Sequence, residues 1–113
     1  MSEETSAIHY INYLELEKIL NAQHPVSGKE KDAAHEETLF IIIHQTYELW
    51  FKQILHEMDS IMTLFRSNNI DESSIGVVSN RMSRINKIMD TLINQVDILE
   101  TMTSLDFLDF RNH

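Results

Sequence analysis

The sequence predicts an all-α protein: a helical bundle with two long antiparallel helices, a shorter N-terminal helix and the start of a fourth helix. The 113 residues include only 2 glycines and 1 proline, so few turns interrupt the chain. Apolar side chains recur three and four residues apart over two long stretches, which is the spacing of one helix face. The length suits one small domain, so we assign residues 1–113 to a single helical domain.

The N-terminal part is expected to hold the shorter helix. Residues 1–8 should fray, as chain ends commonly do. A helix is then expected from about Tyr10 to about Gln23, with apolar positions at Ile11, Leu14, Leu16, Ile19 and Leu20. The stretch from His24 to Lys31 contains Pro25, Ser27 and Gly28 and is typical of a loop.

The second helix is the longest one that the sequence predicts. Asp32 is its expected N-cap, and it should end near Ser67-Asn68-Asn69. Glu48 and Lys52, four residues apart on its more exposed side, are expected to pair. Its apolar side chains indicate that more than one face is buried, and therefore an oligomer or a further partner sequence. They are Phe40, Ile43, Tyr47, Trp50, Phe51, Ile54, Met58, Ile61, Met62 and Phe65.

A third helix should begin at Asp71-Glu72-Ser73-Ser74. A short polar connector separates it from the second helix, so the two should pack antiparallel as a helical hairpin. Thr103 or Ser104 would cap a fourth helix that has hardly begun when the sequence stops at His113. The apolar positions of the third helix are Ile75, Val78, Met82, Ile85, Ile88, Leu92, Val96, Leu99 and Met102.

Composition excludes several classes of protein. The formal net charge is −9 and no basic face is visible, so a nucleic-acid partner is not expected. There is no cysteine, which excludes disulfides and thiolate metal sites. The acidic N-terminus lacks the features of a signal peptide, and the longest apolar run, Leu39 to Ile43, is too short to cross a bilayer. We expect a soluble cytoplasmic protein without a membrane partner.

Motifs for a self-contained metal site are missing. No glutamate is followed three residues later by a histidine, the pattern of helical di-iron sites. His35-Glu36 is followed by Leu39 where a zinc-peptidase helix needs its second histidine. No glycine-rich phosphate loop occurs, and the scattered serines and histidines define no catalytic triad. We therefore predict no metal ligands in this chain.

His44 is the most informative candidate residue. It lies within the apolar series of the second helix, with Phe40, Tyr47 and Phe51 at −4, +3 and +7, so its ring should lie among aromatic rings. The simpler interpretation is a core histidine bonded to a backbone carbonyl or a side chain. The alternative is a pocket residue that gives or takes a proton near neutral pH.

Arg111, Tyr10 and Tyr13 can likewise be interpreted either as structural residues or as residues that contact a ligand. Arg111 follows Phe107-Leu108-Asp109-Phe110 and is most simply a surface residue paired with an acid. Alternatively it is a clamp for a carboxylate, which a guanidinium binds through two parallel hydrogen bonds. Tyr10 and Tyr13 are most simply packing residues of an amphipathic helix, and the alternative is contact with a ligand.

At these residues the chain resembles tryptophan 2,3-dioxygenase, the haem enzyme family that opens the indole ring of L-tryptophan. Four blocks match in order, and His-Gln-x-x-Glu-Leu-Trp is highly specific. Glu36 is a small departure, since the family more often has Asp there. The blocks are Tyr10–Leu14 with Ala22–Ser27; His35–Ile41; His44–Lys52; and Leu99–Thr103 followed by Phe107–Arg111.

The resemblance implies a function and a role for each candidate residue. The reaction would be L-tryptophan and O₂ to N-formylkynurenine at haem, the first step of kynurenine-pathway tryptophan degradation. His44 matches the distal histidine near the substrate indole N–H, a positioning partner rather than an obligatory base, and Phe40 an aromatic residue of the same haem-side pocket. Arg111 matches the arginine that holds the substrate carboxylate. Tyr10, Tyr13 and Leu14 match residues that reach into a neighbouring subunit's pocket in a homotetramer built as a dimer of dimers.

The resemblance also shows what this sequence lacks. The family is much longer, and its proximal histidine and the threonine near the substrate ammonium have no match here. None of His9, His24, His35, His44, His56 and His113 matches the proximal ligand, which haem iron needs. We therefore expect the distal half of a site, without stable haem binding or catalysis by the chain alone.

Two interpretations of the chain remain open. In the first, it is the N-terminal portion of a complete dioxygenase, and the stop at Arg111-Asn112-His113 inside a starting helix favours this. In the second, it is a catalytically inactive stand-alone helical module that self-associates or binds a partner. A complementary C-terminal chain would favour the first interpretation. A stable oligomer of this chain without such a complement would favour the second.

Overall fold

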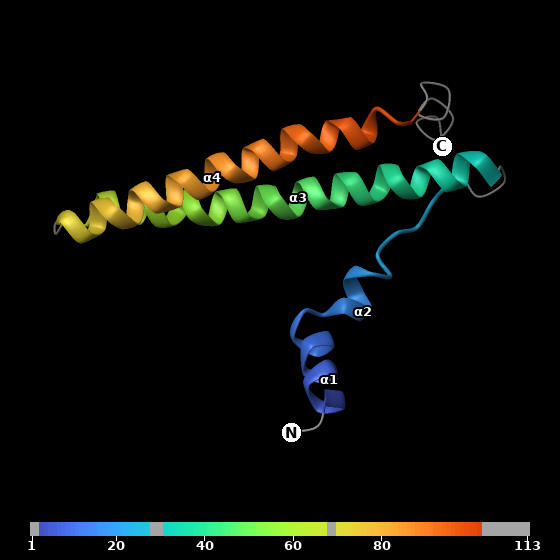
Figure 1. The fold of residues 1–113 in the computed structure, drawn as a ribbon, viewed down its shortest axis with the longest axis horizontal. Helices are drawn as coiled ribbons and strands as arrows, with labels where there is room; N and C mark the ends of the chain where they lie inside the picture. Colours follow the sequence, from blue (N-terminus) through green and yellow to red (C-terminus); the bar gives the residue numbers. More distant parts are fainter. Residues whose placement is uncertain (1–2, 28–30, 68–69, 103–113) are drawn as a thin grey trace.

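The computed structural model describes residues 3–27, 31–67 and 70–102, and within them the chain forms four helices and no strand. They are α1 (Glu3–Tyr13), α2 (Leu16–Ile19), α3 (Lys31–Arg66) and α4 (Glu72–Leu99). Helices α3 and α4 lie side by side as an antiparallel hairpin, and α1 and α2 project from it (Figure 1). We call residues 3–20 the N-terminal arm. The prediction of an all-α fold with two long antiparallel helices is confirmed.

The hairpin has a narrow apolar core. Ile43 and Ile61 of α3 and Ile88 and Leu92 of α4 are its buried apolar residues among those described. Polar contacts border this core: the Tyr47 hydroxyl donates to the carbonyl oxygen of Leu92 at 2.8 Å. The single hydroxyl hydrogen of Thr46 is shared between the Ile43 carbonyl oxygen at 2.7 Å and Gln95 Oε1 of α4 at 3.1 Å. These bonds fix the register of the two helices over the segment that contains His44.

The ends of the long helices follow the local sequence closely. The third predicted helix begins within Asp71-Glu72-Ser73-Ser74, as expected, and the structure makes Asp71 the N-cap of α4: its carboxylate accepts the backbone N–H of Ser74 at 2.9 Å. Helix α3 begins at Lys31, so Asp32 lies in its first turn and not at the predicted cap position. Its end at Arg66 agrees with the predicted stop. The predicted fourth helix falls in residues 103–113, outside the described residues.

The predicted single helix from Tyr10 to Gln23 is wrong. The chain is already helical from Glu3, where two acidic residues favour a helix N-terminus, so the expected fraying of residues 3–8 is not observed. The helix then breaks at Glu15, which adopts left-handed φ 52° and ψ 43°, a conformation that costs about 1–2 kcal/mol. Leu14 and Leu16 are both half-buried. Two residues apart, they would lie on nearly opposite sides of one continuous helix, and the break removes that constraint.

Much apolar surface of the isolated chain faces solvent. Trp50 and Phe51 are 38% and 43% exposed, although the sequence indicated burial of more than one face of α3. Leu55 and Phe65 on the same helix are exposed as well. Burial by a second copy or by further sequence therefore stays a prediction. Within residues 3–27, 31–67 and 70–102, no helix has the length and apolarity needed to cross a membrane.

Candidate functional site

The rings of His44 and Phe40 form a pair on one side of α3. Their centroids lie 4.2 Å apart with the planes inclined by 36°. His44 Nδ1 lies 2.7 Å from the carbonyl oxygen of Phe40. A carbonyl only accepts, so Nδ1 must carry the hydrogen in this contact. In the neutral ring Nε2 is then the nitrogen with a free lone pair, ready to accept a hydrogen bond from a ligand.

His44 is exposed, so the interpretation as a core histidine is wrong in one respect and right in another. The predicted bond to a backbone carbonyl is present. Burial falls instead on the preceding residue, Ile43, which is 4% exposed and faces the hairpin core. Successive residues of a helix differ by about 100° in direction, which turns His44 toward solvent. Tyr47 and Phe51 stack on each other, with centroids 6.1 Å apart.

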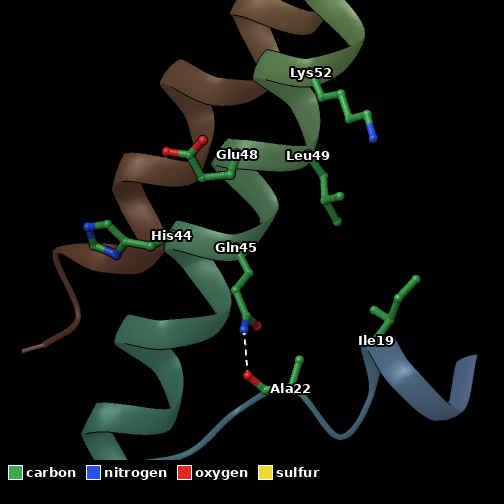
Figure 2. A pocket seen from close by; sticks show the side chains of 7 residues that line it. All are labelled: Ile19, Ala22, His44, Gln45, Glu48, Leu49 and Lys52. Carbon is green, nitrogen blue, oxygen red and sulfur yellow. Dashed lines mark hydrogen bonds between the residues drawn. The ribbon is translucent and has the colours of Figure 1, made fainter.

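An open groove of about 490 Å³ lies between residues 19–22 and α3 (Figure 2). His44 is one of its lining residues, but in Figure 2 the imidazole ring points to the side of α3 away from Ile19. Leu49 of α3 and Ile19 of α2 face the groove from opposite sides. The side chains of Glu48 and Lys52 point away from each other in Figure 2, and no ion pair joins these two described residues. The predicted pair is therefore absent, since an exposed ion pair gains little against the entropy of two long side chains. The lining residues are Ile19, Ala22, His44, Gln45, Glu48, Leu49 and Lys52.

Gln45 attaches the end of the N-terminal segment to α3. Its Nε2 donates to the carbonyl oxygen of Ala22 at 2.9 Å (Figure 2). Its Oε1 accepts from Gln23 Nε2, also at 2.9 Å. The side-chain amide of Gln45 thus bonds to two consecutive residues, to Ala22 as a donor and to Gln23 as an acceptor.

Glu37 makes a second attachment two turns earlier on α3. Its carboxylate oxygens accept the backbone N–H groups of Val26 and Ser27, each at 2.8 Å. The hydroxyl of Ser27 donates to the same carboxylate. Glu37 and Ser27 are each only 4% exposed. Sequence reasoning did not single out Glu37 or Gln45 for this role, because no periodic pattern relates them to partners 10 to 23 residues away.

The structure brings together only some of the predicted site residues. Phe40 and His44 are in contact. Tyr10 and Tyr13, 60% and 77% exposed, lie on α1, which points away from α3 (Figure 1). Leu14 is half-buried at the break after α1. Arg111 lies outside the described residues.

A carboxyl group with a lowered pKa lies elsewhere on the hairpin, at Glu57. The hydrogen bond from Arg84, followed by one from Gln53, holds the pKa of this carboxyl below its ordinary value of 4.5. Among the described residues, no cluster of three or more histidine and carboxylate side chains is arranged to hold a metal ion. The candidate site therefore consists of a positioned imidazole, an aromatic ring and an apolar groove.

Comparisons with known proteins address the whole sequence. The model of the family described as tryptophan 2,3-dioxygenase matches residues 1–113. A tryptophan 2,3-dioxygenase of Bdellovibrio bacteriovorus is 56% identical over 93% of this chain and 29% of its own length. One of Dictyostelium discoideum is 53% identical over 93% of this chain and 26% of its own length. One of Alteromonas mediterranea is 43% identical over the whole chain and 31% of its own length. The chain thus spans about a quarter to a third of the length of these relatives.

Proposed function

Since this chain belongs to the tryptophan 2,3-dioxygenase family, we propose that it is the N-terminal portion of a haem-dependent enzyme that converts L-tryptophan and O₂ to N-formylkynurenine. In this proposal it contributes the distal half of the site. The observation that carries the proposal is the contact between His44 and Phe40 inside the matched sequence. That contact presents an oriented hydrogen-bond acceptor beside an aromatic ring, which suits an indole.

His44 acts as the positioning partner of the substrate. Its Nδ1–H is engaged by the Phe40 carbonyl, so Nε2 accepts the indole N–H of tryptophan. The helix backbone holds the imidazole in this tautomer, and the ring can position the indole without a proton transfer. The Phe40 ring, whose centroid lies 4.2 Å from that of His44, packs against the flat face of the indole.

Arg111, Tyr10, Tyr13 and Leu14 complete the substrate pocket in this proposal. Arg111 holds the tryptophan carboxylate through paired hydrogen bonds. The other three reach the pocket of a neighbouring subunit in a homotetramer. The high exposure of Tyr10 and Tyr13 on an arm that leaves its own hairpin supports this role in trans (Figure 1).

The described residues do not by themselves fit a haem. His44 and its neighbours form one open wall, and an exposed groove does not exclude water from both faces of a macrocycle. Haem therefore belongs to the complete enzyme, where it would supply the activation of O₂. The part of this chain is to bind and orient the indole.

A second candidate function is a catalytically inactive helical module that self-associates or binds a partner. The exposed apolar surface of the arm and of α3 favours it, because isolated soluble domains rarely leave so many large apolar side chains uncovered. The two functions differ in whether tryptophan turnover appears when the remaining family sequence is added.

A haem titration of the purified chain, followed by absorbance and by tryptophan turnover, tests the proposal. We expect no axially ligated haem spectrum and no turnover from the chain alone. Turnover should appear when the missing C-terminal portion of a family member is supplied as a second chain. Turnover by the chain alone would contradict the proposed division of the site. A stable oligomer that gains no activity from the second chain would support the inactive module instead.

A further inference from the structure

We propose that Glu37 and Gln45 are positioning residues that together set the direction in which the N-terminal arm leaves the hairpin. We call their contacts to residues 22–27 the arm clamp. The functional meaning of the arm clamp rests on the proposed function, in which this arm carries Tyr10 and Tyr13 into a neighbouring subunit. Its geometry rests on the contacts of this chain alone.

The arm has no helix packing of its own against the hairpin. Among the described helices, α1 contacts α2 and α3 contacts α4, whereas neither arm helix packs on α3 or α4. The direction of the arm therefore depends on the segment that follows α2. That segment, residues 22–27, is irregular backbone, which would pivot if nothing held it.

Glu37 provides the buried half of the arm clamp. Three donors from two consecutive residues, Val26 and Ser27, converge on its carboxylate. Hydrogen bonds from backbone N–H groups to a charged acceptor are among the stronger ones, and they are most effective away from water. The carboxylate thus fixes the orientation of two adjacent peptide groups and not only their distance from α3.

Gln45 provides the second point of attachment. It bonds both the Ala22 carbonyl and the Gln23 side chain, and Gln23 in turn donates to the carbonyl oxygen of Ile19 in α2. One point of attachment leaves a segment free to rotate, whereas two points separated by two helix turns define its direction. Gln45 also follows His44 directly, so the arm clamp and the candidate site share one turn of α3.

Single substitutions can remove the Glu37 contact and the Gln45 contact one at a time. Glu37→Gln keeps the shape but offers one acceptor oxygen where three donors converge, and its amide N–H₂ opposes a backbone N–H. Ser27→Ala removes only one of the three donors. Gln45→Ala removes both bonds to residues 22 and 23. The matched controls are Glu36→Gln, which removes the same charge one residue away, and Glu48→Ala, which removes a groove side chain without touching the arm clamp.

The distance between the arm and the hairpin can be measured by double electron–electron resonance. The chain has no cysteine, so Asn12→Cys on α1 and Asn94→Cys on α4 place spin labels at two exposed positions only. Dilution with unlabelled chain removes distances between copies, and circular dichroism checks that helix content is retained. We expect one narrow distance peak in the parent and in both controls. Glu37→Gln and Gln45→Ala should lose it in favour of a broad distribution, with Ser27→Ala intermediate.

A narrow peak that persists in Glu37→Gln and in Gln45→Ala would overturn the arm clamp. A broad distribution in the parent chain would overturn it as well. The distance measurement does not depend on enzymatic activity, so its outcome is independent of the proposed dioxygenase function. Failure of turnover in the complete enzyme would leave the measured arm direction unchanged.

Discussion

Arg84 of α4 donates from Nη1 to Oε2 of Glu57 on α3, at 3.0 Å, and so joins the two helices of the hairpin. Gln53 Nε2 donates to the same oxygen at 2.8 Å. The Glu57 side chain is 4% exposed, whereas that of Arg84 is 52% exposed. A carboxylate removed from water in this way needs its partners, because an unpaired charge is costly to bury.

Acid should destabilise the hairpin through Glu57. The Arg84 hydrogen bond is the main reason that the pKa of Glu57 is lowered in the folded chain. The stability that this lowered pKa contributes is therefore fully present above about pH 4.5. The contribution is lost as the pH falls through the lower, folded pKa. The pKa of Asp71 is lowered as well, mainly by the hydroxyl of Ser73, and adds in the same sense. Thermal unfolding followed by circular dichroism should show Tm falling below pH 4.5, and less steeply in Arg84→Met. An equal slope in that variant would contradict the assignment to this pair.

Truncation of the hairpin core should be strongly destabilising. Leu92→Ala or Ile88→Ala removes a side chain that is only 6% exposed, and each should cost about 2–5 kcal/mol in the free energy of unfolding. Ile93→Ala, at a position 64% exposed, is the matched control and should stay within about 0.5 kcal/mol of the parent. Urea titration measures all three. Equal losses at Leu92 and Ile93 would mean that a partner covers the outer face of α4.

The chain should self-associate through the apolar faces of residues Tyr10–Leu20 and Trp50–Phe65. Light scattering at high concentration should give a mass above that of the monomer. The double substitution Leu55→Glu and Phe65→Glu, at positions 61% and 59% exposed, should return the chain to a monomer with its helix content unchanged. Asn94→Glu, an exposed polar position on α4, should leave the oligomer intact. A monomeric parent chain would count against the prediction.

Removal of the His44 imidazole should slow the complete enzyme without abolishing its activity. If His44 only positions the indole N–H, His44→Ala should lower kcat/KM by less than about 100-fold, the low end of what general-base catalysis contributes. The control is 1-methyltryptophan, which has no indole N–H, and with it the variant and the parent should differ less. A loss of several thousand-fold would identify His44 as a base.

Arg111→Ala should weaken tryptophan binding in the complete enzyme by about 2–5 kcal/mol, the range for removing one partner of a buried charge pair. Calorimetric or equilibrium titration with tryptophan measures this. Tryptamine lacks the carboxylate and should bind parent and variant alike. Unchanged tryptophan affinity would reject the role of Arg111 as a carboxylate clamp.

The two long helices of the hairpin and the family could both be predicted from the amino-acid sequence. Three-and-four spacing from Phe40 to Phe65 and from Ile75 to Leu99 predicts two long helices, because periodicity is a local property of the chain. The start of the second of these helices within residues 71–74 could be predicted for the same reason. The block from His44 to Lys52 was specific enough to indicate the family that the comparisons then showed.

Which residues face the core and how the arm is attached depend on how the chain packs in three dimensions. Ile43 takes the buried position and leaves the adjacent His44 exposed, because packing against α4 selects one side of α3. The left-handed Glu15 divides a helix that local spacing predicts as continuous. Glu37, Gln45 and Glu57 find partners 10 to 27 residues away, and hydrogen bonds over such separations follow from how the chain packs rather than from any local pattern.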